Sequence, residues 1–100
     1  MTTTVKQENN QTIVTIDGRL DVTNSAELEK QISGLFSIKN AQITVDCANL
    51  SYISSSGLRV FLALQKAVSA NQGNLKLLHL ANNIKEVFNI TGFSNLFTIE

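Results

Sequence analysis

Hydrophobic positions in the first part of the chain follow strand spacing and then helix spacing. Two short β-prone segments, residues 5–7 and 12–16, flank a polar cluster at residues 8–11, and this arrangement is typical of a hairpin. Farther along, apolar residues recur at i, i+4, i+7 and i+8, which predicts an amphipathic helix; these residues are Leu28, Ile32, Leu35 and Phe36. We expect Asn24, with Glu27 three residues later, to cap this helix.

The middle of the chain shows a strand, a serine-rich loop and a long helix in succession. Residues 41–46 form a β-prone run, and a helical pattern extends from about Ser56 to Asn71. Gly73 is expected to close this helix, because glycine is the residue most often found just past a helix end. The next predicted strand comprises residues 75–80.

The last part of the chain predicts one more helix and one more strand. Apolar residues fall at i, i+3 and i+4 on the helix; they are Ile84, Val87 and Phe88. Asn83 and Glu86 have the spacing of a capping box, and Gly92 stands where the helix should stop. A final short strand is predicted at residues 96–99.

This order of elements indicates a single α/β domain that comprises residues 1–100. Strands separated by helices pair in parallel, so we expect a mixed, mostly parallel β-sheet with α-helices packed against it. A chain of 100 residues can form one hydrophobic core without disulfides or metal, but it is too short for a second.

Composition and charge exclude several classes of function. Eight basic residues balance eight acidic ones and form no basic run, so neither nucleic-acid binding nor a polybasic membrane patch is indicated. The longest apolar stretch, residues 58–68, is too short and too polar for membrane insertion. The first residues lack the features of an export signal, so a cytoplasmic location is expected. Cys47 is the only cysteine, which excludes an internal disulfide, and no cofactor or metal site is predicted.

The candidate chemistry lies where the serine-rich loop leads into the long helix. Ser54, Ser55 and Ser56 stand side by side and are followed by Gly57. A serine hydroxyl at a helix start can accept hydrogen bonds from free backbone N–H groups. A phosphate there would meet the same groups and the positive end of the helix dipole. From these residues alone, simple turn and cap roles and a phosphorylation switch are both open interpretations.

The residues give little support to an enzyme. His79 is the only histidine, so a hydrolase triad would have to combine it with Ser55 and with Asp46 or Asp21, yet no nucleophile-elbow pattern is present. The glycines do not follow a phosphate-binding pattern either. We expect His79 to cap or pack at a strand end, Asp46 to anchor its loop, and Cys47 to act as a small buried hydrophobic residue.

Five segments together resemble the STAS domain, and within it the bacterial anti-sigma factor antagonists. The resemblance covers nearly the whole chain, and it depends on the order and spacing of the segments more than on any single one. The segments are Gly18-Arg19-Leu20-Asp21, Asp46 to Leu50, Ser55-Ser56-Gly57-Leu58, Ile84-Lys85-Glu86-Val87-Phe88 and Thr91-Gly92-Phe93.

The resemblance implies a non-enzymatic switch that regulates sigma-factor-dependent transcription. Such a protein binds an anti-sigma factor with serine kinase activity and releases it when phosphorylated; a serine phosphatase is the implied second partner. Ser55 matches the phosphoacceptor and Asp21 an acidic residue near the partner surface, so the implied partner-binding residues are Asp21, Ser54, Ser55, Ser56 and Gly57.

Two features of the sequence leave alternatives open. Ser54 stands where the family motif commonly has an acidic residue, and the run of three serines leaves Ser54 and Ser56 as alternative phosphoacceptors. The same fold would also suit a STAS subunit of a transporter or signalling assembly without phosphorylation. A third alternative is a module that binds a nucleotide or another small ligand at the helix start.

Overall fold

The sheet is organised around its longest strand, β2 (Gln11–Leu20), in the computed structural model, which describes residues 1–100. β2 pairs antiparallel with β1 (Thr2–Glu8) through the predicted hairpin. On its other side β2 pairs in parallel with β3 (Gln42–Asp46). The parallel order then continues through β5 (Asn74–Leu78) to β6 (Thr98–Ile99). The predicted mixed, mostly parallel sheet is confirmed.

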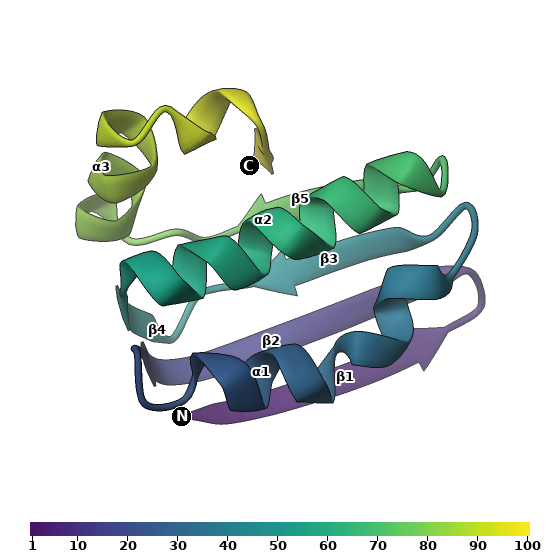
Figure 1. Ribbon diagram of the computed structural model, residues 1–100, viewed down its shortest axis with the longest axis horizontal. Coiled ribbons are helices and arrows are strands. Elements are labelled where there is room, and N and C mark those ends of the chain that lie inside the picture. The colour runs from purple at the N-terminus through teal and green to yellow at the C-terminus, as the bar shows by residue number, and fades with distance from the viewer.

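Three α-helices complete the fold, and the two nearest the viewer in Figure 1 cover one face of the sheet. They are α1 (Ser25–Gln31) and α2 (Ser55–Ala70), which pack against each other. The third, α3 (Asn82–Ile90), packs against α2 through Phe88, whose ring centroid lies 6.3 Å from that of Phe61. None of these helices has the length and apolar character needed to span a membrane.

The core lies between the sheet and the helices, as the apolar pattern predicts. The strands contribute alternate residues to it, so that Ile43 and Val45 are buried while Gln42 on the same strand is exposed. Helix α2 contributes a buried stripe at helical spacing; its large members are Leu58, Phe61, Leu64 and Val68. The predicted position of Cys47 is confirmed, because it is fully buried directly after β3.

One strand, β4 (Leu50–Ile53), lies in a segment that the sequence pattern assigns to a loop. β4 pairs in parallel with the far end of β2, where Gly18 is opposite Leu50 and Leu20 is opposite Ile53. β2 extends to Leu20 instead of ending near Ile16, and its register with β4 shifts between Gly18 and Arg19. Gly18 has a φ of 97°, which side-chain-bearing residues rarely adopt, so glycine allows β2 to change partner here.

Both predicted capping boxes are wrong. Asn24 precedes α1, but its side chain makes no capping bond; its Oδ1 accepts a hydrogen bond from Asp21 N, and its Nδ2 donates one to Arg19 O. The last helix begins at Asn82 after Ala81, so Asn83 lies inside it. The predicted stop at Gly92 follows the helix with a φ of 78°.

Two further boundaries differ from prediction. The first predicted helix is two pieces, because α1 ends at Gln31 and a 3-10 helix, η1 (Ser33–Ser37), follows it. A second 3-10 helix, η2 (Phe93–Asn95), precedes β6, which comprises only the last 2 residues of the predicted strand.

The end of α2 also differs from prediction, because Gln72 and not Gly73 takes the left-handed conformation, with a φ of 62°. The N–H groups of Gln72 and Gly73 donate to Ser69 O and Val68 O, which is the bonding of a Schellman motif. Glycine is needed at position 73 for a different reason. A Cβ there would lie 2.5 Å from Ala41 O and 2.9 Å from Ala41 N.

We predict that Gly73→Ala lowers the free energy of unfolding by about 1–3 kcal/mol, because backbone atoms cannot move aside as a flexible side chain can. Gly34→Ala is the matched control, since a Cβ at Gly34 would meet nothing within 4 Å. The control should change stability by about 0.5 kcal/mol or less. Urea unfolding of both variants measures the effect, and equal midpoints for the two would contradict the close approach.

Candidate functional site

The start of α2 is joined to the end of β2 by the residue that caps the helix. Ser54 follows β4 with extended backbone angles, φ −91° and ψ 172°, and its N–H donates to Leu20 O at 2.9 Å. Its hydroxyl oxygen accepts a hydrogen bond from Gly57 N at 3.2 Å. Ser54 is therefore the N-cap of α2, and its hydroxyl is already used to bond the first turn of the helix.

The other two serines differ in exposure and in bonding. The Ser56 hydroxyl is partly buried and lies 2.9 Å from the Ser54 hydroxyl, with which it shares a hydrogen bond. Ser55, the first residue of α2, is exposed, and its hydroxyl makes no hydrogen bond within the chain. Of the three hydroxyls, only that of Ser55 is both exposed and free, so a modification there would break no intramolecular bond.

Gly57 is buried under the first turn of α2, so its own surface is not available to a partner. A Cβ at this position would lie 2.7 Å from Leu20 Cγ and 3.0 Å from Ile53 Cγ1. The missing side chain lets the first turn of the helix pack directly on the ends of β2 and β4. Gly57 thus positions Ser55 rather than presenting a group of its own.

Asp21 follows β2 directly, one residue beyond the Leu20 carbonyl that bonds Ser54. Its Oδ1 accepts hydrogen bonds from the hydroxyl and the N–H of Thr23, at 2.5 and 3.0 Å. These two bonds, helped by the nearby Arg19 charge, hold the pKa of the Asp21 carboxyl below its usual range. The structure therefore brings an ionised carboxylate and the serine loop to the same end of the sheet.

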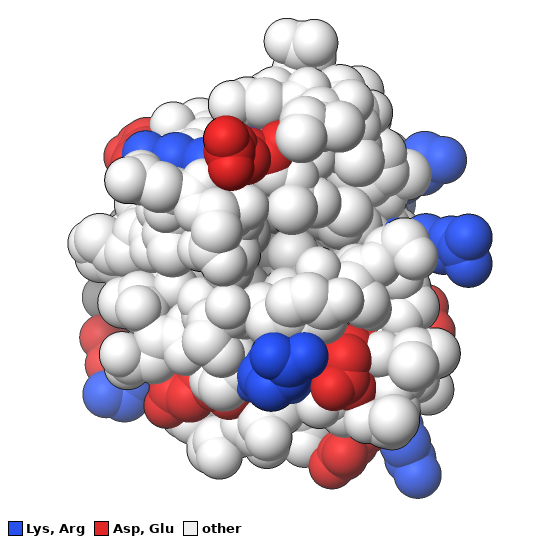
Figure 2. All heavy atoms as spheres, turned by 90° about the vertical axis from the view of Figure 1, so that its left-hand side faces the viewer, with Lys and Arg blue, Asp and Glu red and all other residues white.

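Figure 2 shows this end of the molecule, which is the left-hand side of Figure 1. The middle of the face is a broad area without charged residues, and the Lys, Arg, Asp and Glu side chains lie above it, below it and at its right-hand edge. A doubly negative group added to such an area would change its potential more than one added to a surface already rich in charge.

The sequence pattern did not indicate a contact between Arg19 and Tyr52 beside this loop. Arg19 on β2 is the register partner of Tyr52 on β4, and its guanidinium carbon lies 4.2 Å from the centre of the tyrosine ring. The two residues are separated in the sequence by more than a helix and a strand, and β4 was not predicted. No signal in the chain alone could therefore have placed them together.

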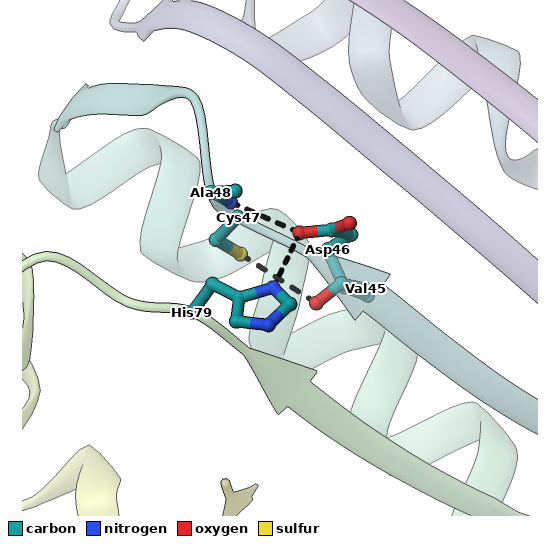
Figure 3. Close-up of polar contacts among 5 residues, drawn as sticks. All are labelled: Val45, Asp46, Cys47, Ala48 and His79. Carbon is teal, nitrogen blue, oxygen red and sulfur yellow. Dashed lines mark hydrogen bonds and ion pairs between the residues drawn. The ribbon is translucent and has the colours of Figure 1, made fainter.

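Asp46 and His79 form a second polar contact at the carboxyl ends of β3 and β5 (Figure 3). Asp46 Oδ1 accepts hydrogen bonds from His79 Nδ1 at 3.0 Å and from Ala48 N at 3.1 Å. The bond from His79, followed by that from Ala48, lowers the pKa of Asp46. Both predictions are confirmed: Asp46 anchors its loop, and His79, with a φ of 63°, lies just past the end of a strand.

The structure gives no further support to a triad or to a small-ligand site at the helix start. No hydrogen bond joins Ser55 to the Asp46–His79 pair. Cys47 cannot replace Ser55 as the nucleophile, because burial raises the pKa of its thiol to about 12. The largest cavity, about 660 Å³, is lined mostly by polar residues of the β1–β2 turn and the segment before β3, and it includes none of the predicted site residues.

Comparison with known proteins decides the family. The sequence model of the STAS domain matches residues 2–100. The chain belongs to the STAS domain family. This STAS domain is 34% identical over 86 residues to the anti-sigma-B factor antagonist of Staphylococcus epidermidis, an alignment that spans 86% of this chain and 80% of the relative.

Solved structures show the same fold. An anti-sigma factor antagonist from Mycobacterium paratuberculosis has a TM-score of 0.86 at 18% identity, with 98% of this chain and 83% of that chain covered. The unphosphorylated form of the anti-sigma factor antagonist SpoIIAA has a TM-score of 0.76 at 18% identity, covering 99% and 87%. The phosphorylated form of Bacillus SpoIIAA has the same score and identity, covering 99% and 91%.

We predict that Ser54→Ala lowers the free energy of unfolding by about 1 kcal/mol through loss of the helix cap. Ser55→Ala removes a hydroxyl that bonds nothing in the chain, so it should leave stability within about 0.5 kcal/mol of wild type. Urea unfolding of both variants makes the comparison. A larger loss for Ser55→Ala than for Ser54→Ala would show that the cap is assigned to the wrong serine.

The lowered pKa of Asp46 predicts a pH-dependent contribution to stability. Since the folded-state pKa lies below the unfolded value of about 3.9, the contribution is present above that pH and is lost as the pH falls through the folded pKa. Asp46→Asn should therefore be less stable than wild type at neutral pH, and the difference should shrink below about pH 4. Urea unfolding across this range tests it; a constant difference would mean that the ionised carboxylate contributes nothing.

Proposed function

We propose that this STAS domain is an anti-sigma factor antagonist whose binding is controlled by phosphorylation of Ser55. It binds an anti-sigma factor with serine kinase activity while Ser55 is unmodified, and the kinase then phosphorylates Ser55 and the complex separates. A serine phosphatase restores the binding form. The protein acts in this way in the cytoplasm, by exchange of partners and not by catalysis, and it thereby regulates sigma-factor-dependent transcription.

The observation that carries the proposal is the free, exposed hydroxyl of Ser55 at the first position of α2. Ser54 is held by the helix cap and Ser56 by its bond to Ser54, so a kinase reaches Ser55 without disturbing either. The similarity to a relative named as an anti-sigma-B factor antagonist supports the same function.

The geometry also suggests how phosphorylation would end binding. A phosphate on Ser55 adds about −1.5 to −2 charges to a face whose centre carries none. The N-terminal N–H groups of α2 stabilise a negative charge at this position, so the helix has no reason to unfold. Release then follows from repulsion of acidic groups or nucleotide phosphates on the kinase, and from the cost of removing water from the phosphate.

Phosphorylation itself is tested by incubating the protein with ATP and the candidate anti-sigma kinases of the same genome. Mass-spectrometric mapping should place phosphate on Ser55 in the wild type and none in Ser55→Ala. Phosphate on Ser54 or Ser56 would overturn the choice of residue. If active kinases modify no serine, a STAS subunit of a transporter or signalling assembly becomes the better hypothesis.

We predict that Ser55→Ala binds the kinase and stays bound in the presence of ATP, whereas Ser55→Asp binds about tenfold more weakly or worse than wild type. Ser37→Asp is the charge-matched control, because Ser37 is exposed at the end of η1, next to Phe36, whose carbonyl accepts a hydrogen bond from Asn71 at the opposite end of α2. Titration calorimetry measures the affinities. Wild-type affinity for Ser55→Asp together with normal dissociation of Ser55→Ala would refute the switch.

A further inference from the structure

Tyr52 is the one aromatic residue that the fold leaves exposed. The chain has five phenylalanines and one tyrosine, and each phenylalanine is buried or partly buried. Tyr52 keeps 39% of its surface accessible, although it belongs to a strand whose end residues, Leu50 and Ile53, are in the core. Tyrosine is among the residues that contribute most to protein interfaces, because it offers a rigid apolar ring with a polar end.

Arg19 holds this ring in place and keeps its own charge unpaired. The guanidinium carbon lies 4.2 Å from the ring centre, within the range of a cation–π contact. Arg19 is exposed and takes part in none of the ion pairs of the structure, which involve Lys6, Lys76 and His79. The two carboxylates nearest along the chain do not pair with it: Asp21 accepts hydrogen bonds from Thr23, and Asp17 takes part in no ion pair. Arg19 therefore presents free N–H donors that suit a carboxylate on another molecule.

The Arg19–Tyr52 pair lies next to the serine loop on both strands. Leu20, which follows Arg19, accepts the hydrogen bond from Ser54 N, and Ile53, which follows Tyr52, leads directly into Ser54. Leu20 and Ile53 point into the core, so Arg19 and Tyr52, one residue before them, point away from it at the same end of the sheet. A partner surface of ordinary size that covers this end of the sheet reaches both Ser55 and the pair.

We infer that the Arg19–Tyr52 pair anchors the unphosphorylated protein to an acidic surface of the anti-sigma factor. This inference rests on the proposed function and adds the chemistry of the partner. The Arg19 guanidinium pairs with a carboxylate of the partner while the tyrosine ring packs against its apolar neighbours. An acidic partner surface is attracted by Arg19 and repelled by a phosphate on Ser55, so the two residues act in opposite directions on the same surface.

The test uses the anti-sigma factor of the same genome that binds the unphosphorylated wild-type chain, in titration calorimetry at low and high salt. Arg19→Gln and Tyr52→Ala should each raise Kd by about tenfold or more. Arg19→Gln should also reduce the dependence of Kd on salt, because one charged contact is lost. Two controls should bind like wild type: Lys39→Gln removes a positive charge from the loop before β3, and Ile13→Ala trims a similarly exposed residue, 37% accessible, at the other end of β2.

The possible outcomes separate this inference from the function on which it rests. If the wild-type chain binds an anti-sigma factor and both Arg19→Gln and Tyr52→Ala bind within about twofold of it, the anchor is wrong and the antagonist function stands. If the wild-type chain binds no anti-sigma factor, the anchor inference and the antagonist function both fail. Urea unfolding checks that each variant is folded, and if Tyr52→Ala is not, Arg19→Gln decides the result alone.

Discussion

The candidate site depends on the close contact between the first turn of α2 and the end of β2. Gly57 lies against Leu20 so tightly that a single added carbon would overlap the leucine side chain, and Ser54 N bonds the carbonyl of the same leucine. These two contacts fix where the long helix begins and how it is oriented on the sheet. Because Ser55 is placed between Ser54 and Gly57, its position follows from packing on both sides and needs no bond of its own.

Under the proposed function, the same contact explains how a face whose centre carries no charge works as a switch. On that proposal, a helix start held by packing gives the kinase a hydroxyl in a defined position, and the helix N-terminus stabilises an added phosphate without unfolding. A molecule bound to this face therefore experiences the full change in charge. A flexible loop at this point would weaken that coupling, because the modified residue could turn away from the partner.

Periodicity was enough to predict the hairpin and the three helices, because each of these is recorded in residues close together in the sequence. The mixed, mostly parallel sheet was predictable because strands separated by helices pair in parallel. The short strand β4 was not predictable in this way. Its burial pattern places two exposed residues between two buried ones, which is not strand alternation. It pairs with β2 from Gly18 onward, where the φ of 97° accompanies a shift in register. The Arg19–Tyr52 contact depends on that pairing and was not predictable for the same reason.

Residue roles at helix ends were harder to predict than the helices themselves. Asn24 has the spacing of a capping residue, yet its side chain bonds the backbone of Arg19 and Asp21 in the preceding loop. Gly73 resembles a helix terminator, yet the approach of Ala41 is what requires a glycine there, and Gln72 takes the strained angle instead. A contact with the preceding loop determined the role of Asn24, and a contact with a distant part of the chain determined that of Gly73, where the local pattern suggested a helix cap in each case.

The burial of Cys47 has a practical consequence for work on this protein. Its thiol is fully enclosed and stays protonated at ordinary pH, so it reacts slowly with maleimides and other thiol reagents. A cysteine introduced at an exposed position would then be the only reactive thiol in the chain. Fluorescent or spin labels could be attached to the face around the start of α2 without first removing a native residue from the core.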